Sequence, residues 1–102
     1  TALNVNGDDA AAAIAIALGA EELLLISDVP GVLADGLPVR ELTPGSAQEM
    51  ISTGQATGGM AAKLEAALRA LDRGISHVRI GDLAAIADSG RGTLLTYARS
   101  FA

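Results

Sequence analysis

The sequence predicts an α/β fold, and two observations carry this prediction. Stretches of helix-forming residues alternate along the chain with short apolar stretches that are typical of strands. The chain also contains only two aromatic residues, Tyr97 and Phe101, although half of its residues are apolar. Its core is therefore expected to consist of Ala, Leu, Ile and Val, and such small side chains favour helices that pack closely on a sheet.

The first part of the chain is expected to form an extended segment, a helix and a strand. Residues 2–5 are expected to be extended, and the Ala-rich stretch after Asp8 is a strong helix former that Gly19 is suited to end. Because this helix is apolar on almost every side, we expect it to be well buried. Residues 22–27 form a short apolar run that is typical of a buried parallel strand, although periodicity alone also allows a helix there.

The middle of the chain is expected to form a hairpin and two helices. Proline and glycine interrupt residues 28–42, where VL and LPV flank an Ala-Asp-Gly turn that predicts a small hairpin. Thr43 followed by proline is an N-cap pattern and predicts a helix that runs over residues 44–53. A further helix is expected over about residues 59–73, with Gly74 at its end.

The last part of the chain is expected to contain two strands. Residues 76–80 alternate in polarity as a strand does, residues 82–89 predict a short helix, and residues 90–97 predict a loop and a last strand. We find no internal repeat and no domain boundary. The 102 residues are therefore interpreted as a single domain or as part of a larger one.

Composition and charge exclude several classes of function. Twelve acidic residues against seven basic ones argue against a protein that coats nucleic acid or an anionic membrane. The absence of Cys excludes a disulfide scaffold, a Cys zinc site and a thiol nucleophile, and a single His excludes a His-rich metal site. No apolar run approaches the roughly 18 residues of a membrane span, and the N-terminus does not resemble a signal peptide. We therefore expect a cytoplasmic protein without nucleic-acid or membrane partners.

A first candidate site lies near the N-terminus. Alternation along an extended segment places Asn4, Asn6 and Asp8 on the same face, at the entry to a helix. One interpretation is a capping cluster at a turn. The other is a set of amide and carboxylate groups at the carboxyl end of a strand, where ligands bind in open α/β sheets.

A second candidate site directly follows the predicted strand at residues 22–27. Ser27, Asp28, Val29 and Gly31 belong to a Ser-Asp-Val-Pro-Gly segment, whose residue types are common in ordinary turns. The alternative is a turn whose backbone and hydroxyl groups face a nucleotide. The segment is neither a Walker A loop nor a Gly-x-Gly-x-x-Gly fingerprint.

A third candidate site opens the helix expected near residue 59. Thr57, Gly58, Gly59 and Met60 lead into this helix, and glycine there lets an anion approach the free N–H groups of the helix start. Lys63, the only lysine of the chain, follows shortly after. A solvated surface lysine is the ordinary interpretation, but its position near a glycine-rich helix start favours contact with a phosphate.

Taken together and in this order, these segments resemble the C-terminal half of the amino-acid kinase family, and within it the acetylglutamate kinase branch. The resemblance is carried by residues 4–33, 41–54, 57–68 and 90–93. The set of Asn-Val-Asn-Gly-Asp before an Ala-rich helix, then Ser-Asp-Val-Pro-Gly-Val, then Gly-Gly-Met-x-x-Lys is specific, whereas no single segment would be.

The resemblance implies a fold and an activity. The fold would be a three-layer α/β/α arrangement around a mostly parallel sheet. The activity would be ATP-dependent phosphorylation of the side-chain carboxylate of N-acetyl-L-glutamate, in arginine biosynthesis, with Mg²⁺ held mainly by the phosphates of ATP. Residues 1–102 would form the ATP-binding part. The N-terminal half that binds the acyl amino acid is not among them, so we expect this chain alone to be inactive. Homo-oligomers or pairing through an exposed sheet edge are also expected.

The resemblance also implies roles for individual residues. Asp8 would orient the catalytic lysines, and Lys63 would stabilise the phosphoryl group during its transfer. Asn4 and Asn6 would contact the substrate. The nucleotide would be bound by Ser27, Asp28, Val29, Gly31, Thr57, Gly59 and Met60.

Two alternatives stay open from the sequence. A related kinase of lysine biosynthesis acts on aminoadipate or glutamate linked to a carrier protein, and the ATP-binding half hardly separates the two activities. A non-catalytic nucleotide-binding module is the alternative from another class of protein.

Overall fold

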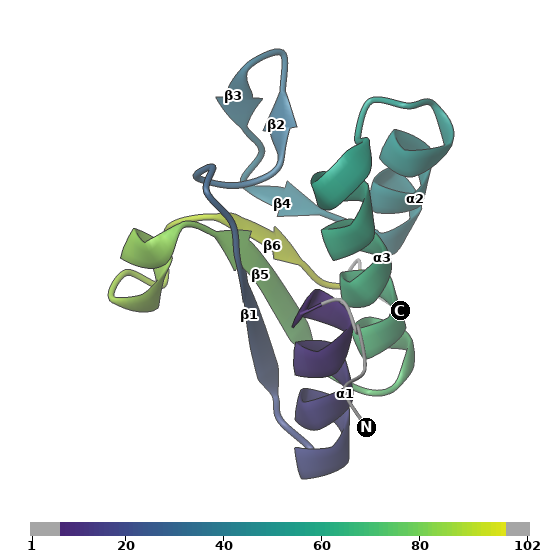
Figure 1. Cartoon of the computed structure of the whole chain (residues 1–102), viewed down its shortest axis with the longest axis vertical. Coiled ribbons are helices and arrows are strands. Elements are labelled where there is room, and N and C mark those ends of the chain that lie inside the picture. Colours follow the sequence, from purple (N-terminus) through teal and green to yellow (C-terminus); the bar gives the residue numbers. More distant parts are fainter. Residues whose placement is uncertain (1–6, 98–102) are drawn as a thin grey trace, which may run out of the picture.

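The computed structural model describes residues 7–97 of the chain (Figure 1). The helices are α1 (Gly7–Leu18), α2 (Pro44–Ser52), α3 (Gly58–Asp72) and the short 3₁₀ helix η1 (Leu83–Ile86). The strands are β1 (Glu22–Ile26), β2 (Leu33–Ala34), β3 (Leu37–Pro38), β4 (Glu41–Leu42), β5 (His77–Gly81) and β6 (Thr93–Leu95).

Four of the strands form one mixed sheet in the order β1-β5-β6-β4. The pairs β1–β5 and β4–β6 are parallel, and β5–β6 is antiparallel. Helices α1, α2 and α3 pack on one face of this sheet, and the segment that contains η1 projects on the other side (Figure 1). The predicted α/β class with a mostly parallel sheet is confirmed.

The core between the sheet and α3 is aliphatic, as the composition predicts. Leu25, Val78, Ile80 and Leu95 point from three strands toward the helices and are almost completely buried. The side of α3 that faces them is built from fully or almost fully buried residues: Leu64, Ala66, Ala67, Ala70 and Leu71. Alanine on this side lets the helix approach the sheet closely, which explains how the core of the described residues forms without an aromatic side chain.

The prediction that the first helix is well buried is wrong. In α1 only Ala12 and Ala15 are buried, whereas Ile14 is 60% exposed and Leu18 is 78% exposed. The reason is position: within residues 7–97, α1 packs against β1 and α3, beside the outermost strand of the sheet, and its other sides have no such neighbour (Figure 1). Apolar residues around a helix show that it can be buried on every side, but not that neighbours are present on every side.

The turns and helix ends follow their local sequence closely. The β2–β3 hairpin turns at Asp35 and Gly36, whose φ angles are 53° and 80°, as a type I′ turn requires. The helix predicted after Thr43 is α2. The predicted helix over 59–73 is α3, and it is followed by Gly74 with φ at 104°. Strand β4 was not predicted, because two residues are too few to show a periodic pattern.

Thr43→Ala is expected to lower the free energy of unfolding by about 1 kcal/mol. Thr43 Oγ1 accepts a hydrogen bond from the Ser46 backbone N at 3.2 Å and thereby caps α2. Thr53→Ala is the matched control, since Thr53 Oγ1 donates only to the exposed Glu49 carbonyl oxygen, which water can solvate instead. Urea unfolding of both variants measures the difference. Equal losses in the two variants would show that the cap contributes nothing specific.

Candidate functional site

Asp8 and Lys63 form an ion pair between the starts of two helices. Lys63 Nζ donates to both carboxylate oxygens of Asp8, each at 3.0 Å. Asp8 lies in the first turn of α1 and Lys63 in the second turn of α3, and the two helices pack against each other. The Asp8 side chain is only 16% exposed and that of Lys63 only 17%, so both charged groups are held largely out of water. The structure thus brings together two residues that are 55 positions apart in the sequence.

The start of α3 near this pair is open. Apart from the adjacent residues and the backbone of α3 itself, a Cβ atom at Gly58 or Gly59 would meet nothing within 4 Å. Thr57 occupies the N-cap position with extended backbone but makes no side-chain capping hydrogen bond. The first N–H groups of a helix have no partner within the helix, and the helix dipole favours an anion beside them. Space, backbone donors and the Lys63 cation therefore occur together at this end of α3.

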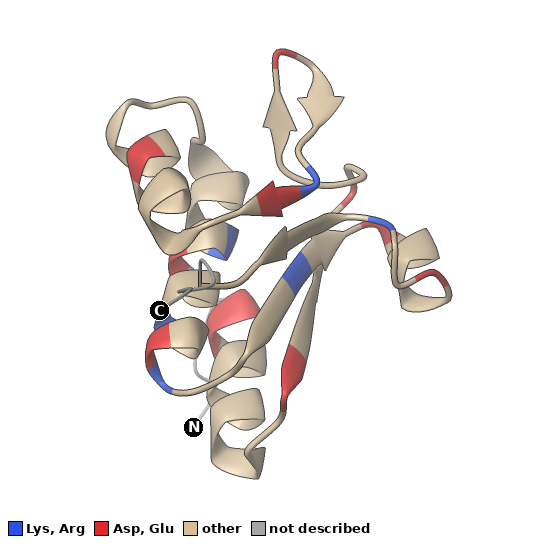
Figure 2. Cartoon of the chain, turned by 180° about the vertical axis from the view of Figure 1, so that it is seen from behind, with Lys and Arg blue, Asp and Glu red and all other residues tan. Residues whose placement is uncertain are grey.

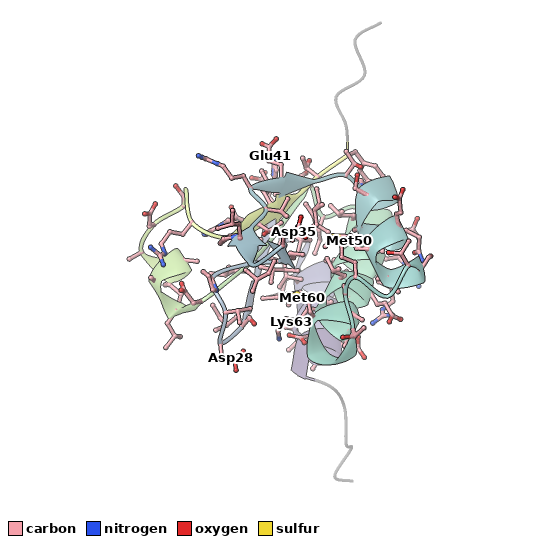
Figure 3. The ribbon with its side chains drawn as sticks, turned by 90° about the horizontal axis from the view of Figure 1, so that it is seen from above. Asp28, Asp35, Glu41, Met50, Met60 and Lys63 are labelled. Atoms are coloured by element: carbon pink, nitrogen blue, oxygen red, sulfur yellow. The ribbon has the colours of Figure 1, made fainter. Side chains whose placement is uncertain are left out.

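An apolar cavity of about 230 Å³ lies between the loop after β1 and the segment that joins α2 to α3. Its lining residues are Val29, Val32, Leu33, Gln55, Ala56, Thr57 and Met60. In Figure 3, Met60 and Lys63 lie on the side of α3 that faces the loop carrying Asp28. The cavity is large enough for a flat aromatic ring system, and it lies one helical turn from the Asp8–Lys63 pair.

The turn after β1 contacts the ends of β5 and β6. The Ser27 backbone N donates to the Gly81 carbonyl oxygen at 2.7 Å and continues the β1–β5 ladder by one residue. The Val29 backbone N donates to Ser27 Oγ at 3.4 Å. Gly31 is buried so closely against β6 that a Cβ atom there would lie 2.8 Å from Thr93 Oγ1. Glycine at this position therefore has a packing reason.

Thr93 belongs to the segment 90–93 that carries part of the resemblance, but no individual role was predicted for it. It is fully buried, its Oγ1 accepts from the Val32 backbone N at 2.9 Å, and it donates to the Val39 carbonyl oxygen. One hydroxyl group thus joins β6 to both ends of the hairpin segment. No local pattern predicts this role, because the partners of Thr93 are more than 50 residues away in the sequence.

Most of the predicted site residues gather on this side of the molecule. Val29, Thr57 and Met60 line the cavity, and Gly59 lies in the first turn of α3. Ser27, Asp28 and Gly31 belong to the turn after β1, where Asp28 is exposed and Gly31 is buried. The predicted substrate contacts Asn4 and Asn6 lie outside the described residues.

Charged residues elsewhere are spread over helices, strands and loops (Figure 2). Within residues 7–97, no three His, Cys, Asp or Glu side chains come together as a protein-held metal ion would require. None of the helices described has both the length and the apolar character needed to cross a bilayer.

Comparison with known proteins gives consistent results. The sequence model described as "Amino acid kinase family" matches residues 1–82. The acetylglutamate kinase of Chloroflexus aurantiacus is 52% identical over 87 residues, which cover 85% of this chain and 34% of that protein. The acetylglutamate kinase of Rubrobacter xylanophilus is 50% identical, over 99% of this chain and 42% of that protein.

The fold is also similar to a solved structure. The protein smu.665 from Streptococcus mutans matches with a TM-score of 0.82 and 38% sequence identity, over 94% of this chain and 37% of that chain. In all three comparisons, the chain spans between about a third and about two fifths of the length of the protein that it matches.

Proposed function

This chain belongs to the amino acid kinase family, and from that membership we propose that it forms the ATP-binding part of an acetylglutamate kinase. Such an enzyme transfers the γ-phosphoryl group of ATP to the side-chain carboxylate of N-acetyl-L-glutamate. The observation that carries the proposal is the Asp8–Lys63 pair at the open start of α3, beside an apolar cavity. The names and 50–52% identity of the curated relatives support the choice of substrate.

In this proposal Lys63 stabilises the negative charge of the phosphoryl group during its transfer. Phosphoryl transfer depends mainly on positioning and on cations near the phosphate oxygens. A lysine ammonium group has three N–H donors, so Lys63 can keep its contact with Asp8 and still donate to a phosphate oxygen. Asp8 holds Nζ at a defined position, and the low exposure of both side chains limits the alternative positions that water would allow.

The nucleotide would lie across the loop after β1 and the start of α3. The apolar cavity between Val29 and Met60 would receive the base. The phosphates would then extend toward the first N–H groups of α3 and Lys63, while Ser27 and Asp28 border the site from the β1 side. Mg²⁺ would arrive with the phosphates, bound mainly by their oxygens, and would neutralise part of their charge.

This chain matches only 34–42% of the length of the two relatives. The acyl amino acid would therefore be bound largely by residues that correspond to the unmatched part of those proteins. Asn4 and Asn6 would contribute contacts to that substrate. The 102-residue chain alone is accordingly proposed to bind ATP without phosphorylating N-acetyl-L-glutamate. Assembly through the free edge of β1, which has β5 on one side only, belongs to the same proposal.

Met60→Glu is expected to weaken binding of Mg-ATP at least about tenfold, because it places a carboxylate in the apolar cavity near the bound phosphates. Leu37→Glu is the matched control: Leu37 is 70% exposed on the hairpin, outside the cavity. Isothermal titration calorimetry on the 102-residue chain measures both affinities, and circular dichroism checks that both variants fold. If Met60→Glu and Leu37→Glu bind Mg-ATP equally well, the assignment of the cavity to the base is wrong.

A second experiment tests the reaction itself. The full-length gene product is assayed with ATP and either N-acetyl-L-glutamate or a carrier-linked aminoadipate. Turnover of the first compound supports the proposed activity, and turnover of the second alone assigns the chain to the related kinase of lysine biosynthesis. ATP binding without turnover of either would indicate a non-catalytic nucleotide-binding module.

A further inference from the structure

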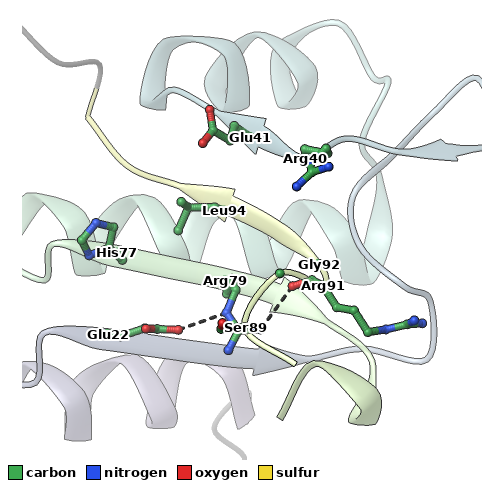
Figure 4. Close-up of a pocket in the computed structure, with 10 residues that line it drawn as sticks. Glu22, Arg40, Glu41, His77, Arg79, Ser89, Arg91, Gly92 and Leu94 are labelled. Atoms are coloured by element: carbon green, nitrogen blue, oxygen red, sulfur yellow. Dashed lines mark hydrogen bonds and ion pairs between the residues drawn. The ribbon is translucent and has the colours of Figure 1, made fainter. Parts of the chain in front are cut away.

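Arg79 is a buried charged residue on the face of the sheet that lies opposite the helices. It occupies the middle of β5, and only 8% of its surface is exposed. Its neighbours Val78 and Ile80 point into the core, so alternation along the strand turns Arg79 to the other face. There it forms part of the wall of a cavity of about 280 Å³, together with Glu22 and the loop that precedes β6 (Figure 4).

The guanidinium group of Arg79 holds the segment between β5 and β6. Nε donates to Glu22 Oε1 at 3.0 Å. One terminal nitrogen lies within hydrogen-bond distance of three backbone carbonyl oxygens, those of Ala85 at 2.8 Å and of Asp88 and Arg91 at 3.2 Å each. All three carbonyl groups belong to residues 82–92, here named the β5–β6 loop. One side chain thus ties this loop to both β5 and β1.

The C-terminal end of the β5–β6 loop, at Gly92, lies next to the turn that follows β1. Gly92 packs on the β5 backbone, where a Cβ atom would lie 3.3 Å from the Gly81 Cα atom. Gly81 in turn faces the Pro30 carbonyl oxygen, which a Cβ atom at Gly81 would approach to 3.7 Å. Thr93, which follows Gly92 in the chain, accepts a hydrogen bond from the Val32 backbone N. Its Oγ1 also lies close to Gly31. The chain of contacts from the guanidinium group to the turn is therefore continuous.

We propose that Arg79 is a positioning residue for the nucleotide. By holding the β5–β6 loop against the sheet, it keeps the turn at residues 27–31 in the conformation that receives ATP. This inference rests on the proposed function, since it assigns a consequence for ATP binding to a residue that does not touch the proposed site. A planar, always charged guanidinium group suits this task, because it can bond to Glu22 and to the loop carbonyl groups in one fixed geometry.

The test combines hydrogen exchange with ATP affinity in Arg79→Lys and Arg79→Met. Hydrogen–deuterium exchange followed by mass spectrometry reports on residues 27–33 and on the β5–β6 loop without any ligand. Exchange in both segments is expected to rise about tenfold, and the Kd for Mg-ATP is expected to rise by about the same factor. The control is Arg40→Met, because Arg40 borders the same cavity but is exposed. It should leave both readouts unchanged.

Glu22→Ala provides a milder variant in case the Arg79 variants do not fold. It leaves Arg79 in place but removes its partner on β1, and the Glu22 side chain itself is 50% exposed. The same two segments should exchange faster, by a smaller factor. Faster exchange confined to the β5–β6 loop, with unchanged exchange at residues 27–33 and unchanged ATP affinity, would overturn the inference. If the unsubstituted chain does not bind Mg-ATP at all, the proposed function itself fails, and with it the role of Arg79 in that binding.

Discussion

Lys63→Met is expected to lower kcat for phosphorylation of N-acetyl-L-glutamate by about 10²- to 10³-fold, with a much smaller change in ATP affinity. Methionine keeps an unbranched side chain that is one atom shorter, and it removes the charge. The loss falls on kcat because the cation acts on charge that is spread over the phosphoryl oxygens in the transition state. Steady-state kinetics of the full-length gene product, with ATP and the acyl amino acid varied separately, measure this effect.

The chain contains a matched control for this prediction. Asp9 and Arg69 form a second ion pair between the same two helices, α1 and α3, but these side chains are 47% and 56% exposed. Exposed pairs of this kind contribute little, so Arg69→Met should change kcat by less than about twofold. A similar loss in Arg69→Met and Lys63→Met would mean that the substitutions act by loosening the contact between α1 and α3, and the catalytic role of Lys63 would be rejected.

Asp8→Asn gives the same prediction a second test. If Asp8 acts only by holding Lys63 Nζ, its loss should matter little once Lys63 is absent. The double variant Asp8→Asn with Lys63→Met should therefore be about as active as Lys63→Met alone, whereas independent residues would show additive losses in free energy. Additive losses would assign Asp8 a separate function, such as contact with the substrate.

The parts of the fold that local sequence determines were predictable. The hairpin turn at Asp35 and Gly36 requires positive φ angles that these residue types tolerate, and the start of α2 depends on the Thr43 side chain and the proline after it. In both cases the physical cause lies within four residues of the effect. The α/β class follows in the same way, from helix and strand stretches that can each be recognised alone.

The parts that depend on distant contacts were not predictable from local patterns. In the sequence, Arg79 looks like an exposed residue of an alternating strand. In the structure, the loop that contains residues 85–91 covers it, and three backbone carbonyl groups of this loop lie within hydrogen-bond distance of its guanidinium group. Likewise, the meeting of Asp8 and Lys63 follows from the packing of α1 on α3. Only the family resemblance pointed to that pair, because no spacing rule relates residues that are 55 positions apart.

Gly92→Ala is expected to lower the free energy of unfolding by at least about 3 kcal/mol, the largest loss expected from a single methyl group in this chain. Gly92 has φ at 90°, and a Cβ atom there would lie 2.6 Å from the Ile80 carbonyl oxygen and 3.3 Å from the Gly81 Cα atom. Both of those are backbone atoms of β5. Ile80 pairs with Thr93 in the β5–β6 ladder, so its carbonyl oxygen cannot move away without disturbing the centre of the sheet.

Gly36→Ala separates the effect of backbone conformation from the effect of packing. Gly36 has a similar φ of 80°, but a Cβ atom at that position would meet nothing within 4 Å. It should lose only about 1 kcal/mol, the ordinary penalty for a side chain in the left-handed region. Urea unfolding of the two variants gives the difference, which should be about 2 kcal/mol or more and measures how firmly the β5–β6 loop is held on β5. Equal losses of unfolding free energy in the two variants would mean that the β5–β6 loop moves away from β5 at little cost in free energy. Contacts between Arg79 and such a loop could not fix the conformation of the turn after β1.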